Sequence, residues 1–374
     1  MRRSNPFHLF HCLWRHGLIN QDTYARFTMD AVDVASLQKR KFARWGAIIT
    51  AMAAGLVLTI LITLNIGAVN MSFETILEVL MGGGTKFQRD IIINTRLPRI
   101  VLGALVGAAL AVAGASMQGV FRNPMASPYV LGISSGAAFG ASLAIVVGIS
   151  WIPGEFAVPS MAFIFCFLTL FLVYAISRTK GGFVPVETLL LAGIAVGAFF
   201  NALVSLMKYF AGEQLSAIVF WMMGGLWQAE WMDVVVALPM ITIGSMILWL
   251  LSRDLNTMMV GEEHALHLGL NVNTVRLIIL LAASLVTAAA VSVSGVIGFV
   301  GLVVPHVVRL LVGPDHRILI PVSLLGGAIF MVWTDTLART IILPAELPVG
   351  IITAMIGAPF FIYLIISRRR KMGW

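Results

Sequence analysis

The chain has 374 residues, of which 59% are hydrophobic and only 11% charged, and its formal net charge is +8 at pH 7. A soluble domain carries about 25% charged residues, so this composition excludes a soluble globular protein and indicates an integral membrane protein. The sequence contains no glycine-rich phosphate loop, no Cys-x-x-Cys and no His-Glu-x-x-His. The two cysteines, Cys12 and Cys166, lie far apart and support neither a disulfide framework nor a metal site.

Residues 1–45 form a polar leader with eight Lys and Arg residues and three Asp residues. The leader has no short apolar core followed by a small-residue cleavage site, so we expect no cleaved signal peptide. Residues such as Phe7 and Trp14 make its first part amphipathic. We therefore expect an N-terminal extension that lies on the cytoplasmic membrane surface, held by anionic lipid. A regulatory or partner-binding role is the alternative.

Apolar stretches long enough to cross a bilayer follow along the rest of the chain. They predict an all-α polytopic membrane protein of about ten transmembrane helices, with one membrane domain over residues 46–370 and a short cytoplasmic tail, 371–374. The predicted spans are 46–68, 98–120, 128–149, 157–177, 187–209, 234–252, 274–294, 296–312, 318–337 and 347–367.

The basic residues are distributed unevenly between the predicted loops. Lys and Arg are concentrated in the segments that face the cytoplasm if the N-terminus is inside. This bias matches the positive-inside rule and predicts that both termini are cytoplasmic. The cluster Arg368–Lys371 is then an orientation signal, and the positive charge does not predict nucleic-acid binding.

The second predicted span, 98–120, is rich in glycine and alanine, with Gly107 and Gly114 among its glycines. Small residues let membrane helices approach each other closely, so we expect this helix to lie inside a bundle. The span is followed by Asn123-Pro124, which we expect to break the helix.

Residues 295–313 place Pro305 and His306 at membrane depth. Irregular backbone is tolerated there only where it is buried in protein or lines a water-filled cavity, so we expect a broken or re-entrant helix. His306 is either a ligand or proton relay or, more commonly, a packed histidine bonded to neighbouring backbone. A faint sequence echo between the second and seventh spans predicts an inverted internal repeat, which is typical of transporters.

The longest predicted cytoplasmic insertion, residues 253–273, is polar and has a helical pattern. Gly261 and Gly269 interrupt it, and Glu262 and Glu263 open a short helix whose N-terminus favours acidic charge. An insertion of this size on a compact bundle usually contacts a partner, although a solvated connector is the alternative.

Several short motifs occur in order along the chain. They are RLPR (96–99), GASMQ (114–118), RNP (122–124), PYVLG (128–132), GEE (261–263), GFVGLVVPH (298–306), DHR (315–317), AELPVG (345–350) and GAPFF (357–361). Together they resemble the permease subunit of bacterial ABC importers for cobalamin, iron–siderophore complexes and haem, the FecCD-like, type II importers. The resemblance covers residues 46–370 and leaves the leader unassigned.

The resemblance implies a homodimer of ten-helix subunits, or a heterodimer with a sister permease, around one translocation path in a bacterial or archaeal cytoplasmic (inner) membrane. Two cytoplasmic ABC ATPase subunits would dock on one side and an extracytoplasmic substrate-binding protein on the other. ATP and Mg would be bound by the ATPase, so the resemblance implies no cofactor and no catalytic residue in this chain.

The resemblance also implies roles for particular residues. Coupling to the ATPase falls on Val260, Gly261, Glu262, Glu263, Leu266, Leu268 and Gly269. The gate and translocation path fall on Asn123, Pro124, Met125, Gly181, Gly182, Val184, Pro185, Thr188, Asn201 and Ser205. Docking of the binding protein falls on Arg96, Arg99 and Arg339, since the planar guanidinium suits carboxylate recognition. The alternative is that these arginines are membrane-interface anchors.

The implied mechanism is alternating access driven by the partner ATPase. An ion-gradient-driven secondary transporter is the alternative, but it would need paired carboxylates near the midplane, and Glu187, Asp335 and Glu346 all lie at span ends. A membrane-embedded enzyme would need a metal or nucleophile constellation, and the sequence shows none. We expect a large metal chelate as substrate, with ferric siderophore or haem ahead of cobalamin, while molybdate-type oxyanions remain open.

Overall fold

The computed structural model describes residues 21–67, 69, 71–149, 151–179 and 184–372. Every regular element within these residues is a helix, as the predicted all-α class requires. The chain divides into two compact units, residues 1–51 and 52–374. The predicted gate residues Gly181 and Gly182 lie outside the described residues.

In the N-terminal unit the described residues belong to one helix, α2 (Gln21–Asn65), which continues beyond residue 51. The expected boundary between leader and first span, at residue 45, is therefore not a break in the helix. Close to this point Lys41 Nζ lies 4.7 Å from the centre of the Trp45 ring, and Phe42 meets Trp45 edge-on. Residues three and four positions apart share one helical face, so these contacts support the helix where its basic charge is highest.

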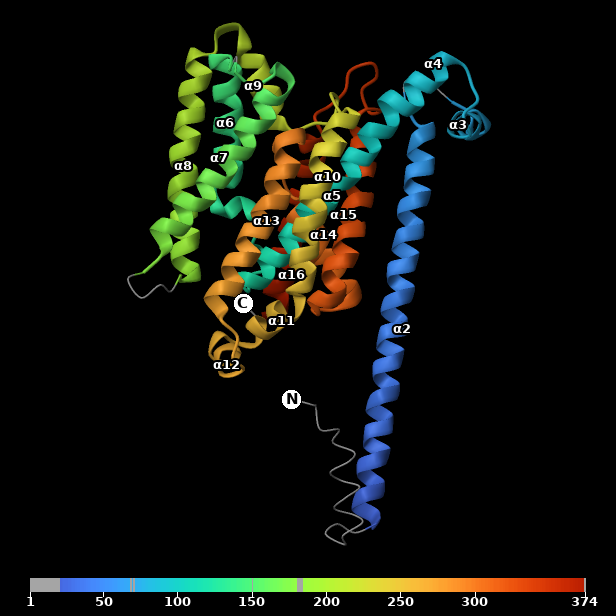
Figure 1. Ribbon diagram of the computed structural model, residues 1–374, viewed down its shortest axis with the longest axis vertical. Helices are drawn as coiled ribbons and strands as arrows, with labels where there is room; N and C mark the ends of the chain where they lie inside the picture. The colour runs from blue at the N-terminus through green and yellow to red at the C-terminus, as the bar shows by residue number, and fades with distance from the viewer. Residues whose placement is uncertain (1–20, 68, 70, 150, 180–183, 373–374) are drawn as a thin grey trace. The chain divides into compact units, whose positions relative to one another are not determined.

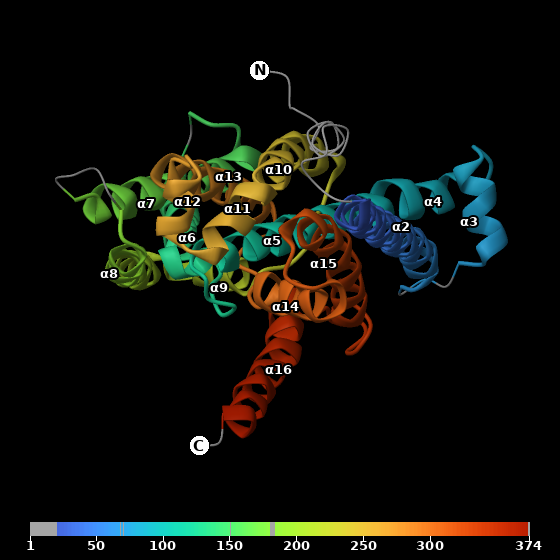
Figure 2. The ribbon, with the colours of Figure 1, turned by 90° about the horizontal axis from the view of Figure 1, so that it is seen from below.

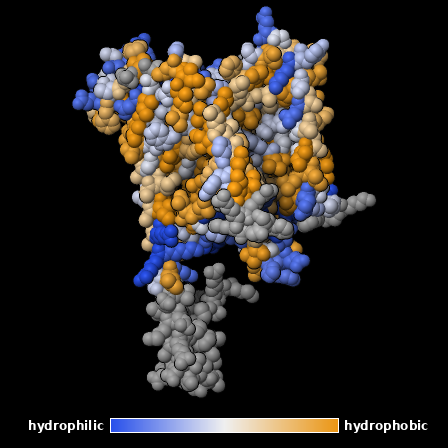
Figure 3. Space-filling view, turned by 180° about the vertical axis from the view of Figure 1, so that it is seen from behind, coloured by the Kyte–Doolittle hydropathy of each residue, from blue (hydrophilic) through white to orange (hydrophobic). Residues whose placement is uncertain are grey.

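The chain is a multi-pass membrane protein. Eight described helices are long and apolar enough to cross a membrane, two shorter apolar helices accompany them, and each overlaps one predicted span. Figure 3 shows one face of the molecule, where hydrophobic residues cover most of the helices and hydrophilic residues gather toward their ends. The long spans are Ser36–Asn65 in α2, Lys86–Val120 ending in α5 (Leu97–Val120), α7 (Gly154–Ser177), α8 (Val186–Phe210), α10 (Trp231–Leu250), α13 (Val272–Ser294), α15 (His316–Ala338) and α16 (Val349–Met372), and the short ones are α6 (Ile133–Val147) and α14 (Val300–Val312).

Helix α5 is central in the unit 52–374, with α10, α13, α14 and α15 packed around it (Figures 1 and 2). The close approach depends on glycine. A Cβ added to Gly107 would lie 2.1 Å from the carbonyl oxygen of Gly327 in α15, and one added to Gly114 would lie 1.9 Å from that of Gly301 in α14. The expectation that small residues bring this span close to its neighbours is confirmed. Helices α6, α7 and α8 form a second group, which α7 joins to α13.

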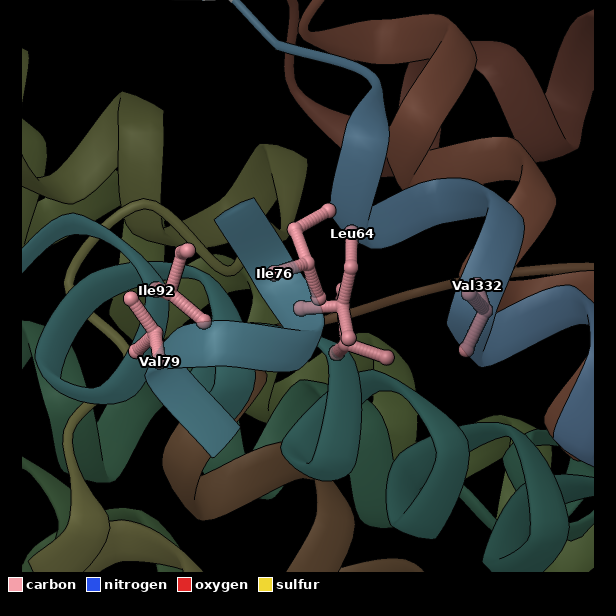
Figure 4. Close-up of a cluster of buried hydrophobic side chains, with 6 residues drawn as sticks. Leu64, Ile76, Val79, Ile92 and Val332 are labelled. Atoms are coloured by element: carbon pink, nitrogen blue, oxygen red, sulfur yellow. The ribbon is translucent and has the colours of Figure 1, made fainter. Parts of the chain in front are cut away.

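Short helices connect the spans, and outside the insertion 253–273 the sequence analysis did not predict them. Ser72 caps α3 through its hydroxyl, and Thr85 begins α4 with a capping box. Helix α3 is held in a buried apolar cluster of Leu64, Ile76, Val79, Ile92, Ile100 and Val332 (Figure 4). The short elements are α3 (Phe73–Leu80), α4 (Lys86–Arg89), a π-helical segment (Asp90–Arg96), 3-10 turns at Pro128–Leu131 and Gly212–Gln214, α9 (Leu215–Met223), α11 (Ser252–Val260) and α12 (Glu262–His267).

Irregular backbone is present in the region 295–313, as expected, but Pro305 is not part of it. The non-helical segment is 295–299, between α13 and α14, where Gly295 and Phe299 have left-handed φ values of 67° and 66°. Helix α14 continues through Pro305.

The continuation of α14 has a local reason. A proline at position 305 leaves the carbonyl group of Gly301 without its helical N–H partner. The buried side chain of Gln118, on α5, places its Nε2 atom 3.5 Å from this oxygen.

The ring of His306 packs edge-on against Phe360 of α16. The inverted relation of the two halves stays a prediction.

Candidate functional site

The predicted partner-binding insertion folds into α11 and α12, which lie together at one end of α5 and α13 (Figure 1). Its base is packed, because Met258, Ala265 and Val272 form a small buried cluster. Its surface away from the bundle is apolar and exposed, at Val260 (74% exposed), Leu266 (59%) and Leu268 (76%). Exposed apolar residues gathered among polar ones are typical of an interaction surface. We call these three residues the α12 surface.

A glycine lies on each side of α12. Gly261 precedes it in an extended conformation, and Gly269 follows it with a left-handed φ of 81°, which favours glycine. The two glutamates between them differ in environment. Glu263 is exposed, whereas the Glu262 side chain turns toward the bundle and is 26% exposed.

Glu262 lies between two arginines. Its Oε1 atom accepts a hydrogen bond from Arg276 Nη2 at 2.6 Å and lies 3.4 Å from Arg122 Nη2. Arg276, near the start of α13, is 1% exposed and also donates from Nη1 to the carbonyl oxygen of Val184 at 2.6 Å. These contacts bring together α12, the turn after α5 and the segment that enters α8.

The predicted gate residues after α5 form a tight turn. Arg122 has a left-handed φ of 47°, and Asn123 Oδ1 accepts the N–H of Met125 at 2.9 Å. Asn123 and Met125 are exposed and Pro124 is half-buried. The break expected at Asn123-Pro124 is present, because α5 ends at Val120.

The remaining described path residues lie in helix α8 or directly before it. Val184 is buried, and Pro185 and Thr188 are half-buried where the helix begins. Asn201 and Ser205 lie one turn apart on its exposed face, and Ser205 Oγ donates to the carbonyl oxygen of Asn201 at 3.0 Å. Polar side chains on the exposed face of a membrane helix indicate contact with water or with another protein chain.

The three arginines predicted to dock a binding protein are buried in this conformation, with Arg96 5%, Arg99 9% and Arg339 6% exposed. Arg99 binds Asp335 through Nε and Nη2, at 2.9 and 2.8 Å, and Glu346 through Nη1 at 2.8 Å. Acids and carbonyl groups of the same chain bind these guanidinium groups. Their docking role stays a prediction.

The other two arginines bind backbone. Arg96 donates to the carbonyl oxygens of Leu64 and Val69, and Arg339 donates to that of Thr63 at 3.0 Å. Burial lowers the pKa of Arg339, although the neighbouring Asp335 raises it.

The acidic residues of the described chain do not form a metal site. In the described ranges, no group of three or more His, Cys, Asp or Glu could hold a metal ion. Asp335 is 2% exposed, but its carboxylate is bound to Arg99, so it is not a free proton carrier of the kind that a gradient-driven transporter needs.

The sequence analysis missed two side-chain links at the end of the bundle that carries α11 and α12. Arg276 is a charged residue within a predicted span, which is itself a signal of function and could have identified it. Asn256 joins α11 to α15, since its side chain contacts Asp315 and His316, both at 2.8 Å. No local pattern signals this second link, because the partners lie 59 and 60 positions away.

Together with the matches to known proteins, the multi-pass helical bundle assigns the chain to the class of membrane transport permeases. Within that class, the chain belongs to the FecCD transport family, whose family model matches residues 55–367.

Named relatives agree with this assignment. The chain is 50% identical over 280 residues to the cobalamin import system permease protein BtuC of Halobacterium salinarum, covering 75% of this chain and 74% of the relative. It is 42% identical over 320 residues to the hemin transport system permease protein HmuU of Yersinia pestis, covering 84% and 94%. A solved structure described as a metal-chelate type ABC transporter in an inward-facing conformation matches with a TM-score of 0.77 and 37% identity, covering 86% of this chain and 99% of the other.

Proposed function

We propose that this chain is the permease subunit of a binding-protein-dependent ABC importer and forms part of the translocation path for a large metal chelate. The observation that carries the proposal is the α12 surface, on a bundle of the FecCD family. Leu266 and Leu268 expose apolar area that a partner would remove from water, at about 25 cal/mol per Å². The partner of matching function is an ATPase subunit, which binds ATP and Mg and performs the hydrolysis.

The proposed orientation places the α12 surface in the cytoplasm, together with both chain termini, and the buried arginine cluster at the outer end. This orientation follows the distribution of Lys and Arg. The membrane would be the inner membrane of a bacterium or archaeon, and a substrate-binding protein would dock at the outer end.

A second permease subunit completes the proposed path. Asn201 and Ser205 lie on an exposed face of α8, so they would line a path only if another chain closed it. A second copy of this chain is the simplest such partner, and a sister permease is the alternative.

The similarity to relatives orders the candidate substrates. A cobalamin permease at 50% identity and a hemin permease at 42% support metal-bound tetrapyrroles as the first candidates. Cobalamin and haem therefore come before ferric siderophores, whereas the sequence alone placed ferric siderophores and haem before cobalamin.

The experiment is to reconstitute the permease with its ATPase in lipid, add its binding protein, and measure ATP hydrolysis with cobalamin, haem or a ferric siderophore. We expect one ligand to stimulate hydrolysis. A Leu266→Glu and Leu268→Glu double variant should lose the ATPase during purification while the permease still folds, because both side chains are exposed. Failure of the unsubstituted chain to bind any ATPase would contradict the proposal and favour a gradient-driven transporter.

A further inference from the structure

A single carboxylate connects three segments at the α12 end of the bundle. Glu262 is the first residue of α12, Arg122 lies in the turn directly before the gate residue Asn123, and Arg276 holds the carbonyl group of Val184. The partner-facing helix is therefore joined through one side chain to both of the segments that we assign to the gate.

The two arginine contacts differ in strength. The contact with Arg276 is 2.6 Å long and its guanidinium is 1% exposed, so separation would leave a buried charge without its counter-ion. The contact with Arg122 is 3.4 Å long and that side chain is 39% exposed, so water can replace Glu262 there. A displacement of α12 should therefore carry α13 and the Val184 segment with it, while the Arg122 turn can be released.

The backbone at Arg122 indicates a use for its side chain. Its φ of 47° lies in the left-handed region, where glycine is favoured and a side chain is strained. An arginine at this position is better explained by its charge than by the turn geometry. The neighbouring Glu263, one position further along α12, is exposed.

We propose that Glu262 is a positioning residue that transmits movement of α12 to the gate, by holding Arg276 firmly and Arg122 releasably. This inference rests on the proposed function, because it requires an ATPase that moves α12. It assigns different roles to two adjacent glutamates, with Glu262 acting inside the permease and Glu263 facing the partner side.

The test uses the permease–ATPase complex in lipid, in a Cys12→Ser background, with Met125→Cys as a reporter of gate exposure. The native Cys166 is buried and should not react. The rate of maleimide labelling at position 125 is measured with and without ATP. We expect ATP to change this rate in the reporter chain, and Glu262→Gln to reduce the change by about fivefold or more while the ATPase still co-purifies.

Matched variants separate positioning from simple stability. Glu213→Gln makes the same chemical change at an exposed glutamate outside the coupling and gate residues, and should leave the ATP response intact. Arg276→Lys keeps the charge but loses the planar guanidinium group, whose two Nη atoms bind Glu262 and Val184. It should therefore partially reduce the ATP response. If Glu262→Gln does not fold, Arg122→Gln on the exposed turn replaces it, with reduced ATP response again expected.

Two results overturn the inference in different ways. A normal ATP response in folded Glu262→Gln, or an equal loss in Glu213→Gln, removes the positioning role but leaves the importer function intact. Absence of ATPase binding by the reporter chain itself removes both the inference and the proposed function.

Discussion

Replacement of Asp335 by asparagine tests the buried charge cluster at the predicted outer end. The Asp335 and Arg99 side chains are 3% and 10% exposed and share three short contacts. Removing one member of a buried pair costs about 3–5 kcal/mol, because the other charge stays buried. Arg99 would retain Glu346, so we expect Asp335→Asn to lower the free energy of unfolding by about 3 kcal/mol, at the low end of that range.

The assay is denaturant-induced unfolding of the purified permease in mixed micelles. Glu346→Gln is the matched control, since its side chain is 39% exposed and its pair with Arg99 should be worth about 1 kcal/mol or less. Replacing the buried pair together, as Arg99→Met with Asp335→Leu, should recover most of the loss. The reasoning is refuted if Asp335→Asn is no less stable than Glu346→Gln.

Three further predictions concern packing and partner binding. Gly114→Ala should strongly reduce the yield of folded protein, because its Cβ would lie 1.9 Å from a carbonyl oxygen, whereas Gly46→Ala, with nothing within 4 Å, should be neutral in the same expression test. Leu268→Asp should weaken ATPase binding about tenfold in a co-purification titration, and Glu263→Gln should not match that loss. Asn256→Leu should loosen α11 and speed proteolysis of residues 253–273; unchanged cleavage would show that its bonds to α15 are dispensable.

The sequence predicted what depends on local pattern. Hydropathy identified each of the eight long apolar spans among the described residues, because crossing a bilayer requires a long apolar run. The glycines of the second span predicted its close packing, which the contacts at Gly107 and Gly114 confirm. Gly261 and Gly269 predicted the ends of α12, because glycine is favoured where the backbone leaves the helical conformation.

What the sequence could not predict depends on distant partners. Arg99 binds Asp335, which lies 236 positions away in the chain. The sequence alone therefore suggested an exposed arginine and not a buried ion pair. Glu262 and Glu263 are equivalent in the sequence, but successive residues of a helix point in directions about 100° apart, and the side chain of Glu262 reaches Arg276. Short helices such as α3 were missed because they do not span the membrane, although the capping residue Ser72 was a usable local signal.

The most direct test of the importer function is uptake into sealed proteoliposomes that contain the permease and its ATPase. ATP is enclosed inside, and the binding protein with labelled cobalamin or haem is added outside. We predict uptake that requires both enclosed ATP and the binding protein, and that is lost with the Leu266→Glu and Leu268→Glu double variant. Uptake without ATP, driven instead by an imposed ion gradient, would contradict the assignment of this chain as an ABC importer permease.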